Sequence, residues 1–247
     1  MRRSKKILAL VLVSICTMVI MMGCGKTSSK KLVMATNAAF PPYEYVENDE
    51  YVGIDVEIAK AIAAELGSEL EIQDVEFGSI IAGVQSGKYD MGMAGMTVTE
   101  ERLESVNFSE TYAKGVQSII VVEGSAITSV DDLNESTKIG VQQDTTGDIY
   151  ATEDYGDGAI TRYKNGADAV QALSSGKVDC VIIDNEPAKQ FVAKNEGLTI
   201  LESSYCEEDY AICISKENEE LLTSINAALN KLKADGTIDE IVAKYIH

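Results

Sequence analysis

Residues 91–102, MGMAGMTVTEER, combine small residues with a charged donor and predict a binding site for a small anion. Gly92 and Gly95 carry no side chain that would keep a ligand away from the backbone. Thr97 adds a hydroxyl group, and Arg102 adds a planar, permanently charged fork that matches a carboxylate or a phosphate. An isolated arginine at this spacing is more often a surface residue of an amphipathic helix, so the rest of the chain must decide.

A faint internal repeat supplies a second charged group. The segments IIAGVQSGKYDMGMAG and AVQALSSGKVDCVIID each read as a helix, a Ser-Gly-Lys-x-Asp turn and a buried strand. Setting Gly87 against Gly176 places Gly95 opposite Asp184. Ligands of open α/β sheets lie beyond the carboxyl ends of the strands, so two facing units would place Arg102 and Asp184 across one cleft. Two alternatives stay open: the likeness is chance, and Asp184 is an ordinary helix cap.

The two charged residues together select a particular kind of ligand. Arg102 would pair with an anion and Asp184 with a cation, and an α-amino acid carries both charges close together. Burying either residue without its partner costs several kcal/mol, on the order of the usual penalty for an unpaired buried charge. We therefore expect an amino acid to hold two lobes closed over itself.

The composition excludes several classes of function. The chain has 247 residues and a formal net charge of −19, so nucleic acid, whose phosphates demand a basic face, is not expected as a partner. Charge alone cannot hold such a protein on an anionic lipid surface. The single histidine is His247, which excludes most serine–histidine and cysteine–histidine catalysis and any histidine-based metal site. We expect no metal and no cofactor.

The N-terminus has the pattern of a lipoprotein signal peptide over residues 1–23. A basic start is followed by an apolar run over residues 7–22, which is short for a membrane-spanning helix. Cys24 follows a glycine, as in a bacterial lipobox, so we expect cleavage before Cys24 and lipidation of its side chain. Residues 24–30 would form a polar tether. An uncleaved membrane anchor is the alternative.

Strands and helices alternate along the remaining chain, as in α/β proteins. Strands are predicted at 31–36, 69–75, 88–94, 111–122, 138–141, 178–183 and 208–215. Helices are predicted at 54–66, 80–86, 100–108, from about 148, at 168–174, from 186, at 219–234 and at 238–245. The stiff loop FPPYEY, which follows the first strand, is expected to present Phe40 and Tyr43.

The cysteines left in the mature chain read as ordinary core residues rather than as a functional site. Cys180 and Cys213 lie in apolar, strand-like segments and are most simply small buried side chains. No Cys-x-x-Cys motif occurs, so a zinc or redox site is not expected. A disulfide between Cys180 and Cys206 stays open.

The chain resembles the extracytoplasmic solute-binding proteins of the polar amino-acid uptake family, which capture ligands for ABC transporters. The resemblance spans about residues 32–245, and AGMTVTEER and LKADGTIDEI are its most specific motifs. The matching segments, in family order, are FPPYEY, YVGIDVEIAKAIAAELG, AGMTVTEER, VNFSETY, VQQDTTGD, SGKVDCVIID and LKADGTIDEI.

The resemblance implies an α/β, two-lobed periplasmic-binding-protein fold of type II. Each lobe would be a mixed sheet flanked by helices, with the ligand cleft between the lobes and two crossing strands joining them. The first lobe would hold residues 31–112 and 210–247, and the second residues 113–209. The protein would capture a free amino acid by cleft closure and deliver it to an ABC transporter permease. It would be a monomer on the extracytoplasmic face of the cell membrane, held there only by its lipid anchor.

The resemblance also assigns ligand contacts to the two charged ends of an amino acid. Arg102, with Thr97 and Thr146, would hold the α-carboxylate. Asp184, with the carbonyl of Gly95, would hold the α-ammonium. These assignments agree with the charges that the sequence places opposite each other.

Four further residues are assigned to the ligand side chain. Phe40 and Phe77 would sandwich it, and Asn37 and Gln142 would line its far end. Phe77 read alone would more simply be a core residue and Phe40 a turn residue. The family often has Asp at position 37 and usually has Gly where this chain has Asp144, which leaves the position of the second-lobe loop open.

Three questions of function stay open from the sequence. An enzyme on the same fold, such as a dehydratase or a murein lyase, would need a general acid in the cleft. Glu44 is the one candidate, and a solvated loop residue is its simpler interpretation. A detached sensor domain is a third possibility. Asn37 and Gln142 favour a neutral polar ligand side chain, whereas Asp144 and the overall acidity leave arginine or lysine open.

Overall fold

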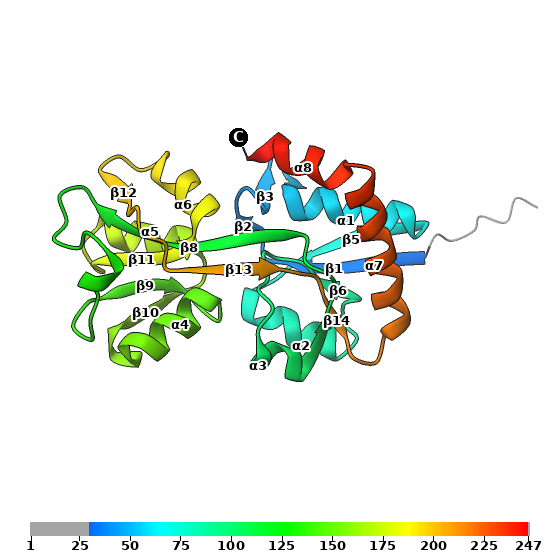
Figure 1. The fold of residues 1–247 in the computed structure, drawn as a ribbon, viewed down its shortest axis with the longest axis horizontal. Helices are drawn as coiled ribbons and strands as arrows, with labels where there is room; N and C mark the ends of the chain where they lie inside the picture. Colours follow the sequence, from blue (N-terminus) through cyan, green and yellow to red (C-terminus); the bar gives the residue numbers. More distant parts are fainter. Residues whose placement is uncertain (1–29, 247) are drawn as a thin grey trace, which may run out of the picture.

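The computed structural model describes residues 30–246, which form two lobes lying side by side (Figure 1). The predicted signal peptide and Cys24 lie outside the described residues. Two antiparallel strands, β8 (Ala113–Val122) and β13 (Cys206–Tyr210), run together from one lobe to the other. Among the described residues, no helix is both long and apolar enough to cross a membrane.

The first lobe is built on a mixed sheet of five strands in the order β5-β1-β6-β14-β7. β1 runs parallel to β5 and β6, whereas β14 runs antiparallel to β6 and β7. A three-stranded antiparallel sheet, β2-β3-β4, lies in the same lobe. The strands are β1 (Lys30–Thr36), β2 (Ala39–Phe40), β3 (Glu44–Glu47), β4 (Glu50–Val52), β5 (Ser68–Asp74), β6 (Met91–Gly92), β7 (Val106–Phe108) and β14 (Cys213–Ser215).

Helices flank this sheet, and the predicted apolar spacing explains how they pack. The helices are α1 (Ile54–Glu65), α2 (Ile80–Gln85), α3 (Glu100–Ser105), α7 (Glu219–Ala234) and α8 (Thr237–Tyr245). Ile58 and Ile62, four residues apart on α1, are fully buried, as are Ile225 and Leu229 on α7. Because residues four apart share one helix face, both helices bury an apolar stripe in a common core.

The second lobe repeats the strand pattern of the first. Its sheet has the order β10-β9-β11-β8-β12, parallel on one side of β11 and antiparallel on the other. The elements are β9 (Ile139–Gln142), β10 (Ile160–Tyr163), β11 (Cys180–Asp184), β12 (Leu198–Ile200), α4 (Thr146–Tyr155), α5 (Gly166–Ser174) and α6 (Asn185–Val192). The prediction of a two-lobed α/β fold with a mixed sheet in each lobe is confirmed.

The internal repeat corresponds to equivalent units of the two lobes. In one lobe α2 leads through a turn into β6, and in the other α5 leads through a turn into β11. Gly87 and Gly176, which the sequence sets against each other, have left-handed φ values of +73° and +69° in these turns. Only glycine adopts such values without strain, which explains why the turn is the most similar part of the two units.

Sheet membership does not assign the paired stretch of β8 and β13, where the two strands cross between the lobes, to either lobe. Residues 113–117 of β8 pair with β13, whereas the later residues of β8 pair with β11 and β12 in the second sheet. The predicted lobe boundaries at 112/113 and 209/210 fall in this paired stretch and stay a prediction.

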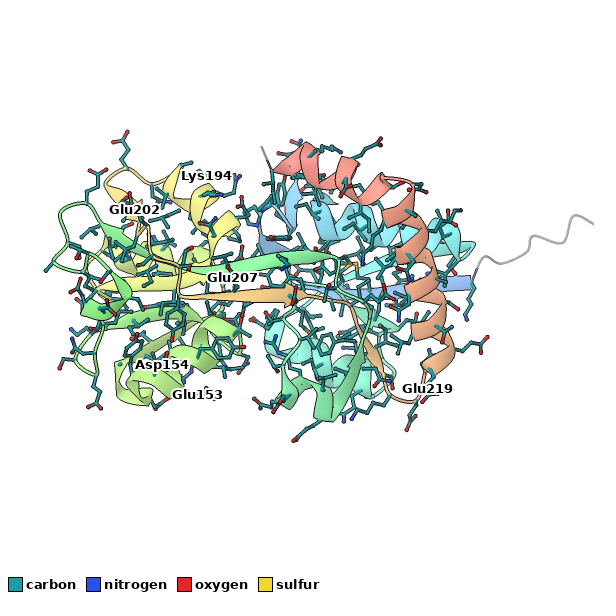
Figure 2. The ribbon with its side chains drawn as sticks, in the orientation of Figure 1. Glu153, Asp154, Lys194, Glu202, Glu207 and Glu219 are labelled. Carbon is teal, nitrogen blue, oxygen red and sulfur yellow. The ribbon has the colours of Figure 1, made fainter. Side chains whose placement is uncertain are left out.

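Glu207 on β13 points outward (Figure 2), and its neighbour Glu208 is buried.

Several local predictions are wrong, each for a physical reason. The strand expected at 88–94 is reduced to Met91 and Gly92, because residues 88–90 form the turn after α2. The helix expected to reach residue 108 ends at Ser105, and β7 follows because it pairs with β14 at the sheet edge. Tyr43 is not presented to ligand but is 2% exposed in the core of the first lobe.

The cysteines are core residues, as predicted. Cys180 and Cys213 are fully buried in the two lobes, and burial raises the pKa of each thiol to about 12. Both therefore stay protonated at neutral pH. Cys206 is half-buried, and all three cysteines of the described residues are free, so the disulfide left open between Cys180 and Cys206 does not form here.

Candidate ligand-binding site

One cavity between the lobes contains every residue that the sequence assigned to a ligand. The nine residues come from both lobes and reach one enclosed space. They are Asn37, Phe40, Phe77, Gly95, Thr97, Arg102, Gln142, Thr146 and Asp184. The cavity is also lined by Glu44, which the sequence offered only as a possible general acid, and by residues that it did not assign: Ala94, Gln117, Thr145, Ile182, Ile183 and Tyr210.

Arg102 provides a buried positive charge on one side of this cavity. Thr99 caps α3 by accepting a hydrogen bond from the Arg102 backbone N–H, which sets the helix start where the sequence predicted it. The Arg102 side chain is 6% exposed, and its Nη1 donates to the Thr97 carbonyl at 2.9 Å. Among residues 30–246, no acidic side chain forms a salt bridge with Arg102. The guanidinium is therefore held by neutral groups and keeps its charge for another partner.

Two threonine hydroxyls from opposite lobes meet beside this arginine. Thr97 Oγ1 and Thr146 Oγ1 lie 3.4 Å apart, and both residues are buried. Thr146 begins α4, whose cap is Thr145, so the positive end of a helix dipole also points toward this corner of the cavity. Two hydroxyls, helix N–H groups and a guanidinium together suit a carboxylate.

Asp184 provides a buried negative charge from the second lobe. Its Oδ1 accepts from the Glu186 N–H at 3.0 Å, and its Oδ2 accepts from the Val116 N–H at 3.1 Å and the Tyr210 hydroxyl at 2.6 Å. Asp184 is therefore a helix cap and a cavity residue at once, so both interpretations from the sequence hold. Burial raises the pKa of Asp184 to about 7, because no cation neutralises the carboxylate among the described residues.

Gly95 needs to be glycine for two reasons. Its φ is +52°, and a Cβ at this position would lie 3.0 Å from the Phe40 ring. Its N–H donates to Asp55 Oδ2 at 2.8 Å, which fixes the peptide at the edge of the cavity. A Cβ at Gly92, by contrast, would lie 2.4 Å from Ile80 and 2.5 Å from Cys213, so Gly92 serves packing rather than ligand approach, and that expectation is wrong.

The two phenylalanines differ in how they are held. Phe77 is 9% exposed, belongs to a core cluster and lies 5.4 Å from the Arg102 guanidinium carbon, so it combines the packing and the cavity roles. Phe40 is half-buried and contacts the cores of both lobes. It also stacks on Tyr43 with ring centroids 5.9 Å apart. Both rings line the cavity, and both come from the first lobe.

Asn37 and Gln142 meet across the cleft. Gln142 Nε2 donates to Asn37 Oδ1 at 2.9 Å, and Asn37 Nδ2 donates to the Val75 carbonyl at 2.8 Å. These amides come from different lobes, at the carboxyl ends of β9 and β1. They form a neutral polar end to the cavity, in the place where the sequence assigned them to the ligand side chain.

Asp144 has the left-handed backbone conformation that glycine, the usual residue of the family at this position, adopts readily. Its φ is +64°, in the left-handed region that aspartate tolerates better than most residues. Its carbonyl accepts from Arg102 Nη2 at 3.1 Å across the cleft, and its N–H donates to Asp148 Oδ2 at 3.0 Å. A bond from Arg162 Nε to Asp148 at 2.9 Å anchors that loop further. The substitution therefore leaves the loop in contact with the first lobe.

The interpretation of Glu44 as a solvated loop residue is wrong. Glu44 is 1% exposed rather than solvated, and burial raises the pKa of its carboxyl well above the ordinary value. It hydrogen-bonds Asp55, whose pKa burial raises to about 6. Asp55 also accepts from the Tyr112 hydroxyl at 2.8 Å. Among residues 30–246 neither Glu44 Oε2 nor Asp55 Oδ1 has a hydrogen-bond donor, and one proton shared between the two carboxyls would satisfy both oxygens.

Two more residues of the cavity come from the crossing strands. Gln117 on β8 donates to the buried carboxylate of Glu208 at 2.8 Å, and Tyr210 ends β13. Alternation along a strand could have indicated that Gln117 faces inward. No signal in the sequence, however, tells which face of a crossing strand meets a ligand.

Comparison with known proteins agrees with this architecture. The family model of bacterial extracellular solute-binding proteins, family 3, matches residues 32–247. The arginine-binding extracellular protein ArtP of Bacillus subtilis (strain 168) is 33% identical over 248 residues, which cover 96% of each chain. The ABC transporter glutamine-binding protein GlnH of the same strain is 31% identical, with 98% of this chain and 97% of the relative covered.

A solved structure gives the same result in three dimensions. The structure of an ancestral arginine-binding protein bound to arginine has a TM-score of 0.83 and 39% identity to this chain, covering 88% of this chain and 98% of that one. The fold and the cleft define a two-lobed solute-binding protein. The chain belongs to the bacterial extracellular solute-binding proteins, family 3. The predicted family is thus confirmed.

Proposed function

We propose that the protein captures a free amino acid between its lobes and delivers it to an ABC importer. The observation that carries this proposal is the pair formed by Arg102 and Asp184, two buried groups of opposite charge in one cavity, neither of which has an ionic partner among the described residues. An α-carboxylate beside Arg102, Thr97 and Thr146 and an α-ammonium beside Asp184 and the Gly95 carbonyl would neutralise both. The relatives named above for binding arginine or glutamine support this assignment.

We further propose that the amino acid carries a positively charged side chain. Once the α-carboxylate balances Arg102 and the α-ammonium balances Asp184, the Glu44–Asp55 pair still holds one negative charge beside the cavity. Glu44 lines the cavity, so it can accept a hydrogen bond from a guanidinium or an ammonium group. The neutral Asn37–Gln142 contact supplies further polar atoms there. This charge balance favours arginine or lysine over the neutral side chain that the sequence favoured.

Titration calorimetry with arginine and citrulline tests the ligand class. Citrulline has nearly the shape of arginine without its side-chain charge. We expect arginine to bind more tightly by roughly 30-fold or more, and the double change Glu44→Gln and Asp55→Asn, which removes both carboxyls of the pair, to remove most of that difference. Glu47→Gln, which removes an exposed charge of the same strand, is the matched control. Equal binding of arginine and citrulline by the wild type would overturn the charge argument.

An enzyme on this fold is the second candidate, and Glu44 is the observation that favours it. A buried carboxyl with a raised pKa in a ligand cavity has the property of a general acid. Asp55, which shares the proton of this carboxyl, does not line the cavity, and this argues for the binding function. Incubation with each amino acid followed by mass spectrometry distinguishes the two, since a binding protein returns its ligand unchanged.

We also propose that the mature protein is a monomer tethered by acyl chains on Cys24 to the extracytoplasmic face of the cell membrane. The Gly-Cys junction after an apolar run supports this placement. In a separate proposal, the first lobe ends at residue 112 and resumes at residue 210. Metabolic labelling with a tagged fatty acid should label the wild type and leave Cys24→Ser unlabelled. Label that persists in the variant would refute the anchor.

A further inference from the structure

The carboxylate assigned to the ligand ammonium takes one hydrogen-bond donor from the opposite lobe. Asp184 ends β11 in the second sheet, whereas Tyr210 is 1% exposed in the core of the first lobe. The Tyr210 hydroxyl donates to Asp184 Oδ2 at 2.6 Å, the shortest of the three hydrogen bonds that this carboxylate accepts. The bond therefore joins a site residue of one lobe to the packed core of the other.

The Tyr210 ring reaches Asp184 by lying over a glycine of the crossing strand β8. A Cβ on Gly115 would lie 2.4 Å from both Cζ and the hydroxyl oxygen of Tyr210. Because glycine weakens a strand and Gly115 has no positive φ to justify it, the close approach of this ring is the physical reason for the residue. Any other side chain at position 115 would push the hydroxyl away from Asp184.

The first lobe fixes the same ring from its own side. Tyr43, which is 2% exposed, packs edge-on against Tyr210 with ring centroids 5.4 Å apart. Tyr43 in turn stacks on Phe40, a residue of the cavity wall. Tyr210 is therefore packed in the core of the first lobe, at the end of one of the two strands that connect the halves (Figure 1).

We propose that Tyr210 is a positioning residue that completes the ammonium site only when the lobes close. The inference rests on the proposed role of Asp184. Since the hydroxyl moves with one lobe and the carboxylate with the other, closure forms their bond. A donor on Oδ2 favours the ionised carboxylate and fixes its orientation, which is what an incoming ammonium group requires. Closure and ammonium binding thus strengthen each other.

The test compares two buried tyrosines by titration calorimetry. Tyr210→Phe keeps the ring and removes the hydroxyl, and we expect a loss of affinity of roughly 10- to 100-fold, equal for arginine, lysine and glutamine. Equality is expected because every amino acid carries the same ammonium. Tyr112→Phe is the matched control: this buried hydroxyl also donates to a carboxylate, Asp55, but not to Asp184. It should lower the melting temperature and change the affinity for glutamine, whose side chain carries no charge for the Glu44–Asp55 pair to bind, by less than about threefold.

Two further measurements separate positioning from general destabilisation. In Asp184→Ala the additional change Tyr210→Phe should have little effect on affinity, because the acceptor of the Tyr210 hydroxyl is already gone. Gly115→Ala should reproduce the loss seen in Tyr210→Phe, whereas Gly158→Ala, with no atom within 4 Å of its Cβ position, should bind like the wild type.

The outcomes are distinct. A wild type that binds no amino acid overturns the proposed function itself. A wild type that binds, with Tyr210→Phe equally tight or no weaker than Tyr112→Phe, overturns this inference alone. Independent, additive effects of Tyr210→Phe and Asp184→Ala would also overturn it.

Discussion

Acidification should close the two lobes in the absence of any amino acid. In the closed arrangement burial raises the pKa of Asp184 to about 7 from an ordinary 3.8. Opening returns water to the carboxylate, and its pKa falls back toward the ordinary value. The closed form therefore binds a proton more tightly than the open form. Closure is favoured as the pH falls from about 7 toward 4, and that contribution is lost as the pH rises through 7.

The structure sets the size of this effect. Each pH unit between the two pKa values contributes about 1.36 kcal/mol, so Asp184 adds at most roughly 4 kcal/mol to closure at low pH. Tenfold shifts in a population need about 1.4 kcal/mol, so this is enough to convert a mostly open protein into a mostly closed one. Burial also raises the pKa values of Glu44 and Asp55, which act in the same direction wherever opening exposes them to water.

Small-angle scattering of the ligand-free protein measures the closure directly. The radius of gyration of the wild type should decrease between pH 8 and pH 5. Asp184→Asn cannot ionise, so it should already be compact at pH 8. Glu153→Gln removes an exposed acid (Figure 2) and should follow the wild type. A wild type whose size does not depend on pH, or an Asp184→Asn protein that opens at pH 8 as the wild type does, would refute the reasoning.

Three further predictions concern the ligand and the loops that meet over it. Arg102→Ala and Asp184→Ala should each weaken amino-acid binding by about 2–5 kcal/mol, which calorimetry would detect as a loss of roughly 30- to several-thousand-fold. A Cβ at Gly78 would lie 2.0 Å from the Asp144 carboxylate, so Gly78→Ala should cost about 1–3 kcal/mol of affinity by opposing closure, and Asp144→Gly should restore it. A saturating amino acid, at about a hundred times its Kd, should add roughly 2.7 kcal/mol of stability in thermal melts, and a response to sugars instead would contradict the function.

The sequence predicts the parts of the site that depend on local chemistry. Thr99 caps a helix and brings Arg102 to its first turn, and the repeat places Asp184 at the end of an equivalent strand. Both conclusions need only residue types, spacing and the rule that ligands lie beyond strand ends. The aromatic residue Phe77 was ambiguous from the sequence, and it serves both of its expected roles.

The sequence does not reveal contacts that depend on long-range pairing. Glu44 looks like a loop residue, and only the fold places it against Asp55 in a buried pair. Tyr210 and Gln117 gain their positions from two strands that meet about 90 residues apart in the chain, as the Gln117–Glu208 bond illustrates. The short β6 likewise depends on which strands pair beside it. Side-chain charge and spacing carry no information about such partners.

The contacts between the lobes make each lobe a competitor of the ligand. Asn37 bonds to Gln142, Thr97 contacts Thr146, and Arg102 donates to a carbonyl of the opposite loop. Groups that we assign to a ligand are therefore already hydrogen-bonded to one another. A ligand must exchange these contacts rather than only add to them, and its affinity reflects the difference. Selectivity then depends on what the lobes offer each other as much as on what they offer the ligand. Weakening a contact between the lobes that a given amino acid must break would therefore tighten the binding of that amino acid.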